Sequence, residues 1–473
     1  MQNKSIIKKG AELELKIESL AFGGTGVSHH EGAVIFVKNA IPGQTVMARV
    51  YKKRSSYFEA RTLVVLQESV SHSKEKCEHF ADCGGCTFQN LEYDVQLLEK
   101  EQQVKDIFRR IGGFPDVKIE PILGCNEVFN YRNKMEFTFS NRRWLISDVE
   151  DNLPKDFALG LHIAGRYDKI LNINECHIQN ETANGILALV KQMVMDLEIQ
   201  PYDLSIHKGF IRNLIIRVGQ NTDEIMVILV TSRNDTKQLE PIVNALIEKF
   251  PTIASIMNNI NSRKAGVTYG EQQVVLYGKD HIVEKLGQYS FEISPDSFFQ
   301  TNSRQAERLY DVIKAECALT GEEIVYDLFC GTGSISLYIS EMAKEVYGFE
   351  LVSSAVQDAM QNAVNNGVTN ATFLRGDLMD LFRESQETNT FPNPDVMVLD
   401  PPRVGLHPKT IPDILEKSPK RIIYVSCNPS TQARDIKELC ANGYELIKLR
   451  PVDMFPHTPH VENVATLVKI DTD

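Results

Sequence analysis

The sequence contains no long run of apolar residues, and this absence excludes several classes of protein. No segment approaches the roughly eighteen consecutive apolar residues that a membrane-spanning helix needs. The first ten residues, MQNKSIIKKG, carry positive charge, but no continuous apolar stretch follows them as in a secretory signal. Hydrophobic residues make up 42% and charged residues 24% of the chain, the balance of a water-soluble globular protein. We therefore expect a cytoplasmic protein with no membrane partner.

An overall excess of positive charge is also lacking. The formal net charge is −12, which argues against non-specific binding of nucleic acid by the chain as a whole. Residues 1–68 nevertheless hold ten Lys or Arg and six Asp or Glu, a net charge of +4 that leaves −16 for the remainder. A basic module on an otherwise acidic chain is compatible with an RNA partner, although basic surfaces are common in other proteins too.

The pattern of predicted elements divides the 473 residues into three parts. Short β-prone runs separated by turn signals such as FGGTG and IPGQ predict a small OB-like β-barrel in residues 1–68, either RNA-binding or purely structural. Residues 69–293 contain a cysteine-rich knuckle, a helix near residues 93–112 that can pack on the third part, and mostly alternating strands, which predict a mixed α+β domain. In residues 294–473 strands and helices alternate, which predicts a doubly wound parallel sheet.

The dinucleotide-binding motif G-x-G-x-x-G and the P-loop are absent, but another glycine-rich turn is present. The stretch VYDLFCGTGSISL, residues 325–337, predicts a strand, a turn and a helix start, in which Gly331 and Gly333 let the backbone approach a ligand closely. The following strands end in Glu350, which can accept hydrogen bonds from two ribose hydroxyls, in Asp377, which can lie near an adenine ring, and in Asp400 of DPPR. Together these features resemble a Rossmann-like class of S-adenosylmethionine-dependent methyltransferase.

One of the nine cysteines stands where a predicted strand ends, in YVSCNPSTQARD, residues 424–435. Cys427 lies at the rim of the predicted sheet, where a substrate can reach a nucleophile. Together with DPPR, this placement indicates methylation of carbon rather than nitrogen. A thiolate that adds to carbon 6 of a pyrimidine makes carbon 5 nucleophilic, and a base must then remove the carbon 5 proton. The candidate bases, just before the terminal strand, are Glu462, His457 and His460.

The motifs FFQTN, DLFCGTGS, DPPR, SCNP and PHTPHVE occur in the order found in bacterial RNA 5-methyluridine methyltransferases. Over essentially its whole length the chain resembles the iron–sulfur-containing 23S ribosomal RNA members, and its barrel resembles the RNA-binding TRAM module of that family. The resemblance implies that Cys427 is the nucleophile and Glu462 the proton-abstracting base. It also implies that Asp400 contacts the cofactor or the target uracil.

Further positions match cofactor contacts of the family. Besides the turn glycines and Asp400, the matching residues are Gln300, Phe329, Glu350 and Asp377. Ser334 departs from the pattern, because Asn is common at this position, and its cofactor contact is therefore in question. Phe298 and Phe299 can stack on a base, although one of them is expected to pack in the core.

A second group of cysteines has the spacing of a metal site. The stretch CEHFADCGGC supplies Cys77, Cys83 and Cys86, and NECHIQ supplies Cys176, which the family pattern uses as the fourth ligand. Four thiolates suit either a [4Fe–4S] cluster or tetrahedral zinc, and the resemblance favours iron–sulfur. The C-x3-C-x2-C spacing of radical S-adenosylmethionine enzymes is absent, so we assign the cluster a structural or RNA-binding role.

The sequence thus predicts S-adenosylmethionine-dependent methylation of carbon 5 of a uridine in 23S ribosomal RNA. One alternative changes the substrate to transfer RNA, although simpler transfer-RNA members lack both the barrel and the cysteine cluster. A second alternative is a non-catalytic iron–sulfur RNA-binding or assembly factor, and the presence of Cys427, Glu462 and Glu350 counts against it. No obligate protein partner is evident.

Overall fold

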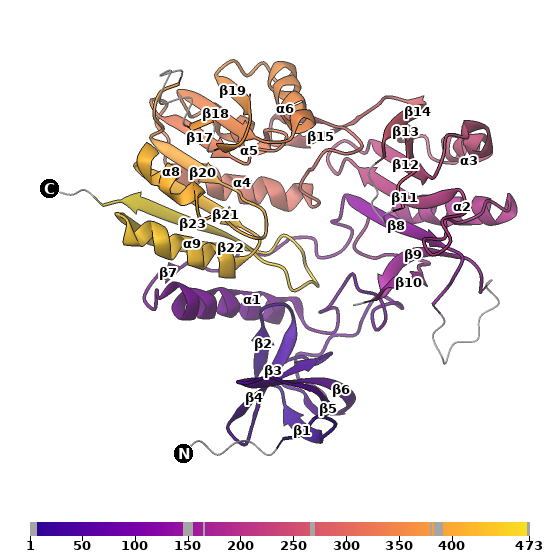
Figure 1. The fold of residues 1–473 in the computed structure, drawn as a ribbon, viewed down its shortest axis with the longest axis horizontal. Helices are drawn as coiled ribbons and strands as arrows, with labels where there is room; N and C mark the ends of the chain where they lie inside the picture. Colours follow the sequence, from indigo (N-terminus) through magenta and orange to yellow (C-terminus); the bar gives the residue numbers. More distant parts are fainter. Residues whose placement is uncertain are drawn as a thin grey trace.

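The protein is built from three sheet-containing units (Figure 1). A computed structural model describes residues 7–144, 155–163, 166–264, 270–378, 381–382 and 391–470. A small barrel lies below a large C-terminal sheet, and a second large sheet stands beside the latter. No helix in these described ranges is both long and apolar enough to cross a membrane.

The N-terminal unit is a six-stranded sheet that curls into an OB-like barrel, as predicted. Its strands follow the order β1-β5-β6-β4-β3-β2: β1 (Glu12–Lys16), β2 (Ser19–Ala21), β3 (Thr25–His30), β4 (Ala33–Lys38), β5 (Thr45–Lys53) and β6 (Tyr57–Gln67). Buried and exposed residues alternate along β4 and β5, because successive side chains of a strand point to opposite faces. The inward-facing residues, including Leu15, Ile35 and Val46, form a separate core.

The central unit is a seven-stranded mixed sheet with two helices packed on it. The strand order is β10-β9-β8-β11-β12-β13-β14: β8 (Lys134–Ser140), β9 (Ala158–Ile163), β10 (Arg166–Asn172), β11 (Ile211–Val218), β12 (Ile225–Thr231), β13 (Ile253–Ile260) and β14 (Gln272–Gly278). Helix α3 (Thr236–Lys249) connects β12 to β13, which are parallel. Together with α2 (Glu181–Asp196) it buries the apolar residues on one face of β11 and β12.

The C-terminal unit is an eight-stranded sheet in the order β19-β18-β17-β20-β21-β23-β22-β7. Its strands are β7 (Lys118–Ile119), β17 (Ile324–Leu328), β18 (Glu345–Glu350), β19 (Ala371–Arg375), β20 (Val396–Leu399), β21 (Arg421–Ser426), β22 (Tyr444–Val452) and β23 (Glu462–Lys469). The five strands from β19 to β21 are parallel, and β23 is antiparallel to both β21 and β22.

Helices cover both faces of this sheet, as the doubly wound prediction requires. Alternate residues of each strand enter two different cores; for example, Ile423 belongs to one and Tyr424 to the other. Helices α4 (Ser303–Cys317), α5 (Ser334–Ser340) and α6 (Ser353–Asn365) pack in the first core. Helices α8 (Thr410–Lys417) and α9 (Pro429–Ala441) pack in the second.

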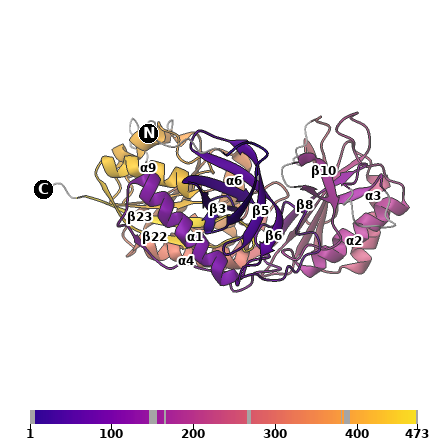
Figure 2. The same ribbon diagram turned by 90° about the horizontal axis from the view of Figure 1, so that it is seen from below.

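Three segments from residues 69–293, the range predicted for the central domain, lie against the C-terminal sheet. Helix α1 (Tyr93–Ile107), with the π-turn η1 (Phe108–Gly112), packs on α9 and runs beneath β22 and β23 (Figure 2). Strand β7 pairs with β22 at the sheet edge. The hairpin of β15 (Ile282–Leu286) and β16 (Tyr289–Ile293) shares the core of α4, α5 and α6. Apolar packing, rather than position in the chain, places these segments.

Candidate active site

The order of the parallel strands in the C-terminal sheet reverses between β17 and β20, and in sheets of this kind a crevice forms at the carboxyl ends of the strands there. The chain runs outward from β17 through β18 to β19 and then returns to the other side of β17 at β20, so the direction of strand addition reverses there. In doubly wound sheets, ligands bind beyond the carboxyl ends of the strands at this reversal point. The predicted glycine turn and the strand ends at Glu350 and Asp400 all border this crevice.

The glycine turn after β17 has a tightly constrained backbone. Phe329, Gly331 and Gly333 have φ values of +68°, +55° and +76°, in the left-handed region that favours glycine. A Cβ built on Gly333 would lie 2.8 Å from the ring of Phe373, so a side chain cannot be accommodated there. A Cβ on Gly331 would meet only open space, which leaves this part of the turn accessible to a ligand.

The carboxylate of Glu350 is held against the glycine turn by backbone donors. One oxygen accepts a hydrogen bond from the Gly331 N–H at 3.1 Å. The other accepts from the N–H groups of Leu351 and Val352, each at 2.8 Å. The carboxylate is therefore fixed in orientation at the end of β18. It retains further acceptor positions, because two carboxylate oxygens together offer about four lone-pair sites.

The other predicted cofactor positions lie in different environments. Asp377 is exposed just beyond β19, and Gln300 is half-buried with its carbonyl accepting from Asn133 Nδ2 at 2.9 Å. Ser334 begins α5, and its hydroxyl lies 2.8 Å from the hydroxyl of the buried Tyr310. Ser334, the residue that departs from the family pattern, is thus paired with a tyrosine that the motif analysis did not single out.

Cys427 and Glu462 are brought together by strand pairing. Ser426 at the end of β21 pairs with Asn463 on the antiparallel β23, so the next residues along, Cys427 and Glu462, face each other at the sheet edge. Gln432 of α9 secures this arrangement, because its Nε2 donates to the Asn463 carbonyl at 2.9 Å and its Oε1 accepts from Asn463 Nδ2 at 2.8 Å. Cys427 is half-buried, whereas Glu462 has an exposed fraction of only 6%.

Burial and nearby charges shift the pKa values of these groups. Burial raises the pKa of the Cys427 thiol to about 11; Glu462 and Asp400 also raise it, and Arg403 lowers it. Burial, and to a smaller extent the charge of Asp400, raises the pKa of Glu462 to about 8. Burial also raises the pKa of Asp400 to about 7. Near pH 7 the thiol and Glu462 therefore favour their neutral forms, whereas Asp400 is about half ionised.

Arg403 is a site residue to which the sequence analysis assigned no role. It follows Asp400 in DPPR, and its carbonyl accepts hydrogen bonds from Asn428 Nδ2 at 3.0 Å and from the Thr431 hydroxyl at 3.3 Å. Its guanidinium donates to His460 Nδ1 at 2.9 Å. The charge of Arg403 lowers the pKa of Cys427, Glu462 and His460 alike. The fixed spacing of Arg403 from Asp400 was the signal that could have identified it.

Cys77, Cys83, Cys86 and Cys176, which we call the cysteine quartet, line one cavity. Its volume is about 440 Å³, and its wall also includes Arg132, Lys134 and the exposed Phe298. Phe299, by contrast, is 5% exposed and packs on Phe291 with ring centroids 5.8 Å apart. The segment carrying Cys77 is tied to that carrying Cys176, because the Asn174 N–H donates to His79 Nε2 at 3.0 Å.

The quartet surrounds a space rather than a single point. All four thiols are free, and within the described residues no group of three or more His, Cys, Asp or Glu side chains converges on one metal-ion position. One tetrahedral ion needs its four ligands within about 2.3 Å of a common centre. Four thiolates suit either a [4Fe–4S] cluster or tetrahedral zinc.

A doubly wound sheet with a glycine turn at its reversal point and an acidic residue ending the next strand is the class I fold of S-adenosylmethionine-dependent methyltransferases. Comparison with known families assigns the chain more narrowly. Residues 222–470 match the tRNA (uracil-5-)-methyltransferase family, and residues 8–63 match the TRAM domain. The chain belongs to this uracil-5-methyltransferase family and is an S-adenosylmethionine-dependent RNA methyltransferase. The predicted fold class and family resemblance are thereby confirmed.

Individual relatives cover nearly the whole chain. An uncharacterized RNA methyltransferase of Chlorobaculum tepidum is 39% identical over 97% of this chain and 96% of its own length. One of Porphyromonas gingivalis is 41% identical over 96% of this chain and 99% of its own. The crystal structure of Pyrococcus abyssi tRNA (uracil-54, C5)-methyltransferase with S-adenosyl-L-homocysteine superposes with a TM-score of 0.75. The two sequences are 29% identical, and the match covers 96% of this chain and 100% of the Pyrococcus abyssi chain.

Proposed function

We propose that this protein methylates carbon 5 of a uridine in 23S ribosomal RNA through a covalent intermediate on Cys427. The observation that carries the proposal is the register of β21 and β23, in which Ser426 pairs with Asn463 and the adjacent Cys427 and Glu462 therefore face each other. A nucleophile and a base on neighbouring strands can act on adjacent atoms of one pyrimidine ring. Binding of an RNA substrate would take place in the cytoplasm.

In the proposed reaction, the Cys427 thiolate adds to carbon 6 of the uracil, forming a C–S bond and an enolate. The bound S-adenosylmethionine supplies an electrophilic methyl group, and carbon 5 takes it while the electron pair of the S–CH3 bond stays on the departing sulfur. Glu462 then removes the carbon 5 proton, and the C–S bond breaks to release 5-methyluridine and the Cys427 thiolate. Arg403, which lowers the pKa of both Cys427 and Glu462, favours the ionised forms that this sequence of steps requires.

Two observations support Glu462, rather than a histidine, as the base. The ring of His457 is already hydrogen-bonded, with Nδ1 3.2 Å from Gln96 Nε2, and burial lowers the pKa of His457 to about 4. Nδ1 of His460 accepts from Arg403, and burial together with that charge lowers the pKa of His460 to about 4. Both rings are thus weak bases. Glu462 has a raised pKa of about 8, which is suited to a proton acceptor near neutral pH.

The crevice supports the predicted cofactor contacts. The fixed carboxylate of Glu350 can accept the ribose hydroxyls, and the open backbone at Gly331 allows close approach of the ligand. In this proposal Asp377 meets the adenine, and Asp400 contacts either the cofactor or the uracil. The remaining contacts of this proposal come from Gln300, Phe329, Gly333 and Ser334. The hydroxyl of Tyr310 orients that of Ser334, where the family commonly has an amide.

We further propose that the cysteine quartet holds a [4Fe–4S] cluster with a structural or RNA-contacting role. The four thiols line one cavity, and the family resemblance favours a cluster over zinc. The adjoining Arg132, Lys134 and exposed Phe298 provide cations and an aromatic face of the kind that bind phosphates and bases. A brown protein with broad visible absorption after anaerobic purification is expected.

Transfer RNA is the second candidate substrate. The Pyrococcus abyssi relative, which matches nearly the full chain, carries a transfer-RNA activity in its name. The deciding experiment supplies purified protein and S-adenosylmethionine with a labelled methyl group to unmodified 23S, 16S and transfer RNA transcripts, which are then digested to nucleosides. Label in 5-methyluridine from 23S RNA alone is the expected result. Label from transfer RNA would change the substrate, and no label in any RNA would favour a non-catalytic RNA-binding or assembly factor.

A further inference from the structure

The loop that leads into Glu462 is buried among side chains from the N-terminal half of the chain. It comprises residues 453–461, which connect β22 to β23 and which we call the base loop; its two ends meet where Val452 pairs with Glu462. Asp453, His457 and Thr458 of this loop are polar, yet their exposed fractions are 0%, 5% and 4%. Because buried polar groups need partners, the position of the base loop depends on the groups that supply them.

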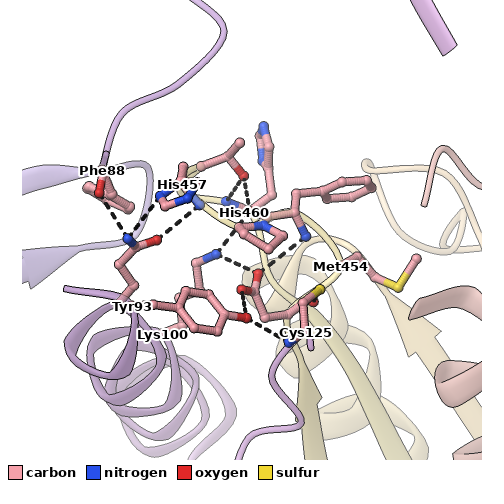
Figure 3. Close-up of polar contacts among 12 residues, drawn as sticks. Phe88, Tyr93, Lys100, Cys125, Met454, His457 and His460 are labelled. Atoms are coloured by element: carbon pink, nitrogen blue, oxygen red, sulfur yellow. Dashed lines mark hydrogen bonds and ion pairs between the residues drawn. The ribbon is translucent and has the colours of Figure 1, made fainter. Parts of the chain in front are cut away.

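A buried ion pair joins helix α1 to the start of the base loop (Figure 3). Lys100 Nζ lies 2.6 Å from Asp453 Oδ1, and the exposed fractions of the two side chains are 1% and 0%. Tyr93 donates its hydroxyl to Asp453 Oδ2 at 2.7 Å, and Lys100 Nζ also donates to the Phe455 carbonyl at 3.2 Å. A buried charge that loses its partner is strongly unfavourable, so this pair fixes α1 and the first residues of the base loop together.

One turn earlier on α1, the amide of Gln96 joins the base loop to the segment that follows the cysteine quartet. Gln96 Oε1 accepts from the His457 N–H at 3.0 Å. Its Nε2 donates to the carbonyls of Phe88 and Leu91 at 2.9 and 2.7 Å. Nδ1 of His457 also lies 3.2 Å from Nε2, whose two hydrogens already serve those carbonyls. Gln96 itself is fully buried.

The same segment contacts the base loop directly. The N–H groups of Thr87 and Phe88, the two residues after Cys86, both donate to the His457 carbonyl, at 2.7 and 3.0 Å. His457 has a φ of +64°, a left-handed conformation that residues with a side chain rarely adopt. Such conformations persist only where the surrounding contacts enforce them. Gln96 and the backbone beside Cys86 therefore determine the path of the base loop.

We propose that Gln96 is a positioning residue for the catalytic base, which couples the base loop, and with it Glu462, to the segment that carries the cysteine quartet. The inference rests on the proposed function, in which Glu462 removes the carbon 5 proton. Loss of the Gln96 amide removes the acceptor of the His457 N–H and the donor to Phe88, so the base loop can leave its constrained path. Cys427, which directly follows β21, would still add to carbon 6, but proton removal would slow. Accumulation of the covalent adduct between Cys427 and RNA, which does not break down, is the result specific to this positioning role.

The test compares Gln96→Ala with Gln102→Ala, which alters an exposed glutamine on the same helix. Each full-length variant receives S-adenosylmethionine and 23S RNA transcript, and denaturing electrophoresis measures the fraction of enzyme joined to RNA. We expect Gln96→Ala to lower turnover by about 10²-fold, the effect of a small misplacement of a catalytic group. We also expect it to accumulate adduct, with unchanged iron content and affinity for S-adenosylmethionine. Gln102→Ala should behave as the wild type.

Hydrogen exchange of the free protein gives a readout that does not depend on activity. The amides of residues 453–461 should exchange faster in Gln96→Ala, and also in Cys86→Ser, which alters the other end of the connection. Unchanged exchange in Cys86→Ser would overturn the coupling to the quartet. If the turnover of Gln96→Ala falls only in proportion to the fraction of folded protein, and no covalent adduct accumulates, the positioning role is overturned.

The failure of this inference is distinguishable from failure of the proposed function. If the wild type forms no 5-methyluridine on any RNA, the proposed function fails, and exchange in residues 453–461 alone decides whether Gln96 holds the loop. If the wild type is active and Glu462→Gln accumulates adduct, the proposed function stands. Absence of both adduct and faster exchange in Gln96→Ala would then reject only the positioning role.

Discussion

The molecule has cysteine thiols in two regions. Their pKa values are raised alike, but the groups that surround them differ. Burial raises the pKa of Cys427 to about 11 and those of Cys83 and Cys86 to about 11 and about 12. Cys427, however, adjoins Arg403 and a carboxylate on the next strand, whereas the thiols of the quartet adjoin one another. The pKa of a cysteine therefore does not distinguish a nucleophile from a ligand. The groups around it do, because a nucleophile needs a base and a cluster needs several thiolates.

The largest expected effect is that of Cys427→Ala. Without the thiol, carbon 5 is not activated, so 5-methyluridine formation should fall by at least about 10⁴-fold. The dissociation constant for S-adenosylmethionine, measured by calorimetry, should change less than about twofold, because the residue lies outside the proposed cofactor contacts. Substantial activity in this variant would reject the covalent mechanism.

Glu462→Gln should lower turnover by about 10²–10⁴-fold, the usual contribution of a general base. Unlike Cys427→Ala, this variant keeps the nucleophile, so a covalent protein–RNA species should accumulate and survive denaturing electrophoresis. Cys427→Ala/Glu462→Gln is the matched control and should form none. A Glu462→Gln variant that turns over without adduct would indicate that another residue takes the proton.

The pH dependence should separate the base from the thiol. Because the pKa of Glu462 is raised to about 8, only about 10% of it is ionised at pH 7 and about 90% at pH 9. Turnover under saturating RNA should therefore rise about tenfold over this interval, since the ionised form is the active one. The rate of adduct formation by Glu462→Gln should show no midpoint near pH 8. It should continue to rise above pH 9, because it follows the ionisation of Cys427, whose pKa is about 11.

The quartet should respond differently from both catalytic groups. Cys83→Ser should abolish the brown colour and lower RNA affinity or thermal stability, while S-adenosylmethionine binding stays within about twofold of the wild type. Cys440→Ser, a half-buried cysteine of α9 outside both regions, is the control and should have the smallest effect of all. If the colour of Cys83→Ser persisted at wild-type intensity, the proposed ligand set would be wrong.

Much of the fold could be predicted because local signals agreed with one another. The glycine turn after β17, the acidic ends of β18 and β20, and the strand before Cys427 each rest on a few consecutive residues. A mixed α+β central domain was predicted, but its helices α2 and α3 were not located, because the apolar strands there dominate the pattern. The alternation of apolar and polar residues also could not decide whether Phe298 or Phe299 packs in the core. The structure buries only Phe299.

Contacts between distant parts of the chain lay beyond sequence reasoning. Lys100 and Asp453 are 353 positions apart, and neither resides in a motif that indicates an ion pair. The placement of α1, β7 and the β15–β16 hairpin on the C-terminal sheet likewise depends on packing partners that local periodicity does not specify. Arg403 was visible in DPPR, but its neighbours His460 and Glu462 come from the base loop and the start of β23.

The attachment of α1 and β7 to the C-terminal sheet has a consequence for engineering chimaeric enzymes. Cutting the chain at residue 294 would leave Asp453 buried without Lys100 and would uncover the edge of β22. A graft of that fragment onto another RNA-binding module should therefore aggregate or lack a formed base loop. The transferable unit is discontinuous: it includes residues 87–125 as well as 282–470, and the barrel, which has a core of its own, is the part that can be exchanged.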